Sequence, residues 1–193
     1  MLLPTPTIEL VKTECTKFDE ENQLAEEALE QLRMQFPRNT DVSHVLLKVL
    51  TLNKLYSTRI HDKDVEATAY HIATLGIDTL LDQGSYNAVD LIANIPNLRK
   101  CYSFATKFCS WHNPIAFPLY DRYVDECLWS YLKQEIQSPF AMFHRQDLWD
   151  YERLVEVVTG FRNYYGLNSL TFKQLDKFLW RLGFQLLRTP TTG

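Results

Sequence analysis

Apolar residues recur at helical spacing along most of the chain, and nowhere do they alternate with polar residues as a half-buried strand requires. An acidic amphipathic segment runs from Asp19 to Phe36 and stops before Pro37, which cannot continue a helix. The clearest apolar stripe follows Pro118, with steps of one, three or four residues: Tyr120, Tyr123, Val124, Cys127, Leu128, Tyr131, Leu132 and Ile136. The pattern predicts an all-α fold.

Start and stop signals locate the other helices. Asp41 is a predicted N-cap for a central apolar helix, and a third helix is expected from about Asp62 to Gly76. One or two short helices are expected around Gly84. The remaining predictions are helices over residues 98–111, from about 118, over 147–165, and from a Thr171–Gln174 capping box to Gly183.

These elements predict one multi-helix globular domain with short irregular ends. Residues 1–18 hold two prolines and mixed polarity, which indicates an irregular N-terminal arm. Residues 19–188 form the predicted single all-α domain, and residues 189–193 a frayed tail. A chain of 193 residues with 46% hydrophobic composition is long enough to bury a full core.

Composition narrows the classes of function. A net charge of −4 and a pI near 5.7 give no overall attraction to nucleic acid, so DNA binding would require a local basic patch. The four cysteines match neither a zinc nor an iron–sulfur spacing and indicate buried thiols in a reducing compartment. Without a targeting or membrane-spanning segment, we expect a cytoplasmic protein that binds no membrane, metal or cofactor. The oligomeric state is not specified by the sequence.

Asp121 is the carboxylate with the most distinctive position. It lies near the start of the helix after Pro118, where free backbone N–H groups and the helix dipole favour a negative charge. It is either an ordinary helix-start acid or a catalytic acid at the edge of a pocket. Asp125, one turn later, either shares that chemistry or belongs to a solvated helix edge.

Aromatic and polar residues flank Asp121 in the sequence. Trp111, His112 and Asn113 either close a helix or offer a stacking surface and an amide to a ligand. With Tyr120 and Tyr123 they form the candidate pocket. No nucleophile motif or glycine-rich phosphate loop occurs, so any catalysis would depend on carboxylates.

The order LIANIPNLRKCYSFATKF, a gap, then PLYDRYV resembles the helix-hairpin-helix base-excision DNA glycosylases over about residues 42–132. Residues 96–99 fall on that family's hairpin and residues 121–124 on its aspartate motif. The spacing from Pro96 to Asp121 is 25 residues, close to that of the family. The resemblance implies a helix-hairpin-helix-like element within the all-α fold.

The resemblance also implies roles for individual residues. Asp121 becomes the catalytic carboxylate, and the DNA-binding residues become Asn97, Arg99, Lys100 and Arg122. Asn97 replaces a hairpin glycine because Asn tolerates left-handed backbone geometry, whereas Arg99 replaces a second glycine that would approach phosphate.

The lysine of lyase members falls on Cys101 or Ser103, so we assign no lyase activity. The expected function is monofunctional cleavage of an N-glycosidic bond in a base or nucleoside. The alternative is a non-catalytic α-helical module that binds nucleic acid or protein. A basic surface of Arg99, Lys100, Lys107 and Arg122 would favour nucleic acid.

Overall fold

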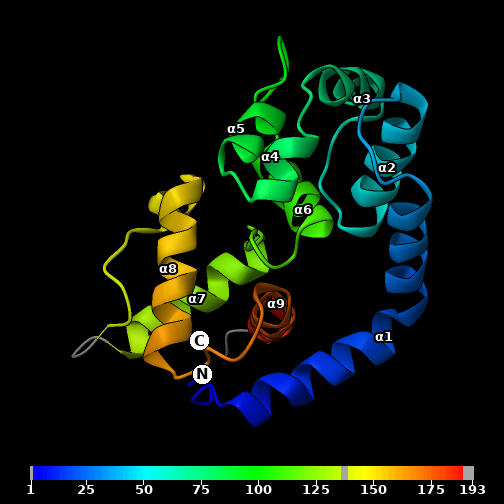
Figure 1. Ribbon diagram of the computed structural model, residues 1–193. Coiled ribbons are helices and arrows are strands. Elements are labelled where there is room, and N and C mark those ends of the chain that lie inside the picture. The colour runs from blue at the N-terminus through cyan, green and yellow to red at the C-terminus, as the bar shows by residue number, and fades with distance from the viewer. Residues whose placement is uncertain (1, 136–138, 189–193) are drawn as a thin grey trace. The chain divides into compact units, whose positions relative to one another are not determined.

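The computed structural model describes residues 2–135 and 139–188 (Figure 1). Within these ranges the regular structure is helical and contains no strand, which confirms the all-α prediction. The predicted tail, residues 189–193, and Ile136, the last residue of the predicted stripe after Pro118, lie outside the described residues. The helices are α1 (Ile8–Gln35), α2 (Val42–Leu55), η1 (Asp62–Asp64), α3 (Val65–Thr74), α4 (Asp78–Gln83), α5 (Asn87–Ala93), α6 (Tyr102–His112), α7 (Arg122–Gln134), η2 (Arg145–Trp149), α8 (Tyr151–Tyr164) and α9 (Phe172–Arg188).

The chain divides into two compact units. Unit 1 comprises Met1–Glu21 and Tyr120–Gly193, and unit 2 comprises Asn22–Leu119, so one division falls within α1. The single domain expected over residues 19–188 remains a prediction.

Unit 2 is built on two pairs of helices. α2 packs beside α3, and α5 beside α6 (Figure 1). Asp41 caps α2 as predicted, because its side chain accepts hydrogen bonds from the backbone N–H groups of Ser43 and His44. The fully buried apolar side chains of α2, α3 and α6 include Val45, Val49, Leu52, Ala69, Ile72, Ala105 and Phe108.

Unit 1 is organised around α7 and α9, which pack against each other; in Figure 1 α9 is seen nearly end-on beside α7. The predicted end of the last helix at Gly183 is wrong, since α9 continues to Arg188. A Cβ atom at Gly183 would lie 1.9 Å from the carbonyl oxygen of Tyr123. This glycine therefore allows two backbones to approach closely instead of ending the helix.

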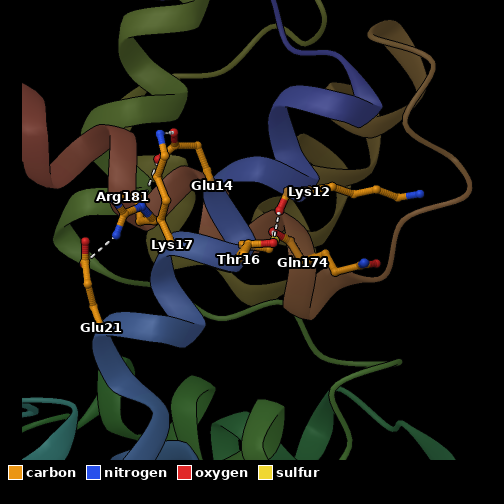
Figure 2. Close-up of polar contacts among 8 residues, drawn as sticks. Lys12, Glu14, Thr16, Lys17, Glu21, Gln174 and Arg181 are labelled. Atoms are coloured by element: carbon orange, nitrogen blue, oxygen red, sulfur yellow. Dashed lines mark hydrogen bonds and ion pairs between the residues drawn. The ribbon is translucent and has the colours of Figure 1, made fainter.

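The predicted irregular arm is wrong from Ile8 onward, because α1 begins there and Thr7 accepts a hydrogen bond from Leu10 N. Val11 and Cys15 on this part of α1 are buried. Figure 2 shows Arg181 of α9 beside α1, where its guanidinium donates to Glu14 (2.8 Å) and Glu21 (2.5 Å). Partners 160 or more residues away in the sequence thus order this segment, which a local pattern cannot reveal.

Three other helix starts also differ from prediction. α6 begins at Tyr102 instead of residue 98, because a turn after Pro96 occupies the intervening residues. α7 begins at Arg122, since Asp121 has extended backbone. The helix expected over 147–165 is divided at Asp150, whose extended backbone and side chain cap α8.

Candidate functional site

A tight turn joins α5 to α6 at the position predicted for the hairpin. Leu98 N donates to the Ile95 carbonyl at 3.1 Å, and Asn97 has a φ of +62°. Proline at the second position and a left-handed third residue are typical of a type II turn. The left-handed geometry predicted for Asn97 is confirmed, and Pro96 and Asn97 are both exposed at the turn.

Arg99 connects this turn to the loop that follows α2. Its Nη2 donates to the Arg59 carbonyl, so two arginine residues meet on adjacent loops. The Lys100 ammonium lies 3.6 Å from Asp90, and both side chains of that ion pair are about half exposed (47% and 62%). Exposed pairs of this kind are weak and are readily exchanged for another anion.

Left-handed backbone without glycine is concentrated in the same two loops. Among the described residues, the non-glycine residues with positive φ are Ser57 (+50°), Arg59 (+62°) and Asn97 (+62°). Each L-residue in this region costs about 1 to 2 kcal/mol, least for Asn. Such outliers gather at functional sites because the surrounding structure holds them in place. We call Ser57, Arg59, Asn97, Arg99 and Lys100 the hairpin surface.

The other predicted basic residues do not join this surface within unit 2. Lys107 is buried, and its ammonium donates to the Tyr56 carbonyl at 3.0 Å. Arg122 belongs to unit 1, where its guanidinium lies over the Tyr123 ring. Arg59 was missed because the sequence STRI contains no glycine or asparagine to indicate a left-handed residue.

Asp121 is the N-cap of α7. Its Oδ1 accepts a hydrogen bond from Tyr123 N at 2.8 Å, and only 8% of the residue is exposed. The helix-start role is therefore observed directly, one residue before the first turn. Tyr123 packs its ring against Trp180 and Phe184 of α9 at centroid distances of 5.3 Å.

Asp125 does not belong to a solvated edge. It is buried and accepts from the Tyr120 hydroxyl at 2.9 Å and from Arg145 Nε at 2.6 Å. Arg145 also donates to Glu126 at 2.8 Å. Burial and the Asp125 carboxylate raise the pKa of Tyr120 above its usual value, so this phenol stays protonated.

The candidate pocket residues are divided between the two units. Trp111, His112 and Asn113 close α6 in unit 2, whereas Tyr120 and Tyr123 lie with Asp121 in unit 1. Asn113 is the C-cap of α6; its side chain donates to the Leu81 carbonyl at 2.9 Å and accepts from Ala116 N at 3.3 Å. Its amide therefore has a structural role in unit 2.

A buried lysine near Trp111 and His112 was not singled out from the sequence. Lys48 of α2 is fully buried, and its Nζ lies 5.9 Å from the centroid of the Trp111 ring. Its ammonium donates to the Arg38 carbonyl (2.9 Å) and to Asn39 Oδ1 (2.8 Å). The signal was a lysine inside the apolar run VLLKVL, flanked on both sides by core positions.

No helix within the described residues is both long and apolar enough to cross a membrane. In the same residues, no group of three or more His, Cys, Asp or Glu side chains is placed to hold a metal ion.

Comparison with known proteins places the chain in a family. A family model, HI_0787_N, described as an N-terminal domain, matches residues 10–116, which is just over half of the chain. An uncharacterized protein of Haemophilus influenzae is 34% identical over 154 residues, covering 77% of this chain and 70% of the relative. No solved structure gives a significant match. On both the matched length and the identity, the chain belongs to the HI_0787_N family.

Proposed function

We propose that this protein binds the phosphate backbone of nucleic acid through the hairpin surface of unit 2. The observation that carries the proposal is that strained backbone and basic side chains occur in the same two loops. All the non-glycine residues of the described chain with a left-handed backbone conformation lie in these loops, which Arg99 joins. These loops expose the basic residues Arg59, Arg99 and Lys100.

Electrostatics favours an anion at this position. The hydrogen bond from the Arg99 guanidinium to the backbone carbonyl of Arg59 holds the two loops side by side, and each loop exposes a cationic side chain that can pair with an anion. Arginine binds phosphate oxygens in a bidentate manner, and an exposed turn allows the phosphate backbone to approach. Because the whole chain carries a net charge of −4, binding must be local and sensitive to salt.

The test is fluorescence anisotropy with labelled duplex and single-stranded DNA at several salt concentrations. We compare the wild type with the double variant Arg99→Glu, Lys100→Glu. Wild-type binding should weaken linearly on a logarithmic salt scale, with a slope of about 0.9 for each phosphate contacted. The double variant should lose binding.

A matched control reverses two exposed lysines of unit 1, Lys12→Glu with Lys133→Glu, and gives the same change in net charge. This control should keep most of the wild-type affinity. No binding by folded wild type at low salt, or equal losses in the two double variants, would contradict the proposal.

Glycosidic bond cleavage by Asp121 is a second candidate function. It is favoured by the position of this carboxylate, which is about nine-tenths buried at the N-terminus of α7. A negative charge held there could stabilise an oxocarbenium-like transition state. The test is base release from duplexes with damaged or deaminated bases: turnover by the wild type that Asp121→Asn abolishes would support it, and no release from any substrate would refute it.

A further inference from the structure

We propose that Lys48, Trp111 and His112, termed the Lys48 cluster, form a binding site for a small oxyanion such as a carboxylate. The cluster lies in unit 2 and is independent of the hairpin surface. Two observations support the proposal. Ring nitrogens of Trp111 and His112 are buried without a hydrogen-bond partner, and the buried ammonium group of Lys48 lies near the Trp111 ring.

The two ring nitrogens are the first observation. Trp111 Nε1 and His112 Nε2 are both buried and have no hydrogen-bond partner. Trp111 is 8% exposed, and its ring centroid lies 4.8 Å from that of His112. A buried polar atom without a partner costs about 1 to 3 kcal/mol, and the usual explanation is an absent water, ion or ligand.

The second observation is the ammonium of Lys48. Among the described residues, both of its acceptors are neutral oxygens, on Arg38 and Asn39. Beyond these two hydrogen bonds, the ammonium lies over the Trp111 ring in a cation–π contact, which is a weaker partner than a charged acceptor. Buried charges are normally paired directly with an opposite charge, which is missing here.

The surrounding charges also favour an anion. Asp78 makes no hydrogen bond to Lys48: it acts on the ammonium by its charge alone and binds Asn39, whose side chain donates to Asp78 Oδ1 at 2.7 Å. Burial and the positive charges of Lys48 and Arg33 lower the pKa of His112 to about 3, so its ring is neutral at physiological pH. In its Nε2–H tautomer, His112 adds a third kind of N–H donor without adding a charge.

The site is not sealed within the core. His112 is only partly buried and follows Trp111 at the end of α6, close to Ile115, which is 77% exposed. A small ligand would therefore bind just beneath the surface. An oxyanion with several lone pairs could accept from the Trp111 indole, the His112 ring and the Lys48 ammonium together.

The test follows the indole N–H signals by ¹⁵N NMR during titration with sodium acetate or sodium phosphate, at an ionic strength held constant with sodium chloride. The chain has four tryptophans, and Trp111→Phe identifies the signal of Trp111. We expect a saturable downfield shift of that signal, with the signal of exposed Trp149 unchanged. Acetate alone indicates a carboxylate site, and a shift with both salts indicates a general oxyanion site.

Variants separate binding from folding. Lys48→Met should weaken the apparent affinity at least tenfold, as should His112→Phe, which is used if Lys48→Met does not fold. The matched control is Lys107→Met, because Lys107 is also a buried lysine of unit 2 that donates to a backbone carbonyl. The control should respond as the wild type does.

Two outcomes would overturn the proposal. One is a Trp111 signal that neither salt moves in the folded protein. The other is a strong nuclear Overhauser effect from the Trp111 indole proton to a long-lived water that both salts leave in place. In that case a trapped water, and not an anion, satisfies these donors.

Discussion

Individual residues at the hairpin surface adopt a backbone that their side chains disfavour. Arg59 is the clearest case, because arginine carries a Cβ atom, unlike glycine, and lacks the short side-chain amide that favours this backbone at Asn97. Its carbonyl accepts from Arg99, so the unusual geometry also positions the contact between the loops. At this position the backbone conformation favours glycine, whereas the proposed binding of phosphate favours arginine.

Replacing this residue separates these two preferences. Arg59→Gly should stabilise the fold by up to about 1 kcal/mol, because glycine adopts a φ of +62° without strain. The same variant should bind DNA more weakly, since a guanidinium is lost. Urea unfolding and anisotropy on one preparation check both effects. A variant that is less stable than the wild type would show that Arg59 is not strained.

Asp121 gives a prediction that does not depend on catalysis. Asp121→Ala removes the side-chain acceptor for Tyr123 N and should lower the free energy of unfolding by about 1 to 2 kcal/mol. Asp121→Ser keeps an oxygen at the cap and should recover most of that loss. If Ser and Ala variants are equally unstable in urea, capping is not what this carboxylate contributes.

At the scale of the helices, the pairing of α7 and α9 depends on one glycine. Gly183→Ala should destabilise the protein by at least about 3 kcal/mol, because the new Cβ would meet the Tyr123 carbonyl at 1.9 Å. Gly166→Ala is the control: its φ is +66° and no atom lies within 4 Å of the new Cβ, so only about 1 to 2 kcal/mol of backbone strain is expected. Urea midpoints in the reverse order would refute this packing.

The contact between α1 and α9 should depend on pH. Burial alone raises the pKa of Glu14, but the hydrogen bonds from Arg181 and Lys17 outweigh it, and the pKa is lowered overall. The carboxylate therefore stabilises the fold fully above its unfolded pKa of about 4.3, and this stability is lost as pH falls through the lower folded value.

The measurement is urea unfolding of the wild type and Glu14→Gln from pH 7 to pH 3. The wild type should be the more stable at pH 7, and the difference should shrink in acid as Glu14 becomes protonated. Arg181→Met, which leaves Glu14 buried without its main partner, should cost about 2 to 4 kcal/mol at pH 7. A difference that does not vary with pH would contradict the role of this ion pair.

Local patterns predicted the helices well where the signal lies within a few residues. The Asp41 cap, the short helices around Gly84 and the Thr171–Gln174 capping box are all present. The errors arose where distant partners decide the structure. Arg181 orders the start of α1. In the sequence Gly183 looks like the end of a helix, but in the structure it is there because the Tyr123 backbone packs against it.

In the candidate site, too, features set by neighbouring residues were predictable and features set by distant residues were not. The turn geometry of Asn97 was predictable because asparagine after proline has a local preference. The grouping of Arg59 with Arg99 was not, since residues 40 apart in the sequence meet only in the fold. The buried role of Lys107 and the orphaned nitrogens of Trp111 and His112 likewise depend on tertiary packing.

At the scale of the molecule, two independent observations divide the chain near the same point. The family match ends at residue 116, and unit 2 ends at Leu119. The hairpin surface and the Lys48 cluster lie in unit 2, whereas Asp121 and its neighbours lie in unit 1. Binding and any catalysis by Asp121 would therefore be properties of different units.

Hydrogen exchange can test whether the units unfold separately. Gly183→Ala should speed amide exchange in α7 and α9 more than in α2, α3 and α6, because the clash lies within unit 1. Exchange is followed by mass spectrometry of peptides, with Gly166→Ala as the control. An equal increase in all these helices would instead favour the single cooperative domain expected over residues 19–188.

The turn before α6 also holds a thiol suited to chemical labelling. Cys101 is partly buried and donates to the Arg99 carbonyl, whereas Cys15, Cys109 and Cys127 are buried. Burial and Asp64 raise the pKa of Cys101 despite the nearby Arg99, so its thiol stays largely protonated at neutral pH and alkylates slowly. Its advantage for labelling is accessibility, because the other three thiols are buried: with a long reaction time or a strongly alkaline pH, Cys101 offers an attachment point for a fluorophore beside the hairpin surface with no engineered residue needed.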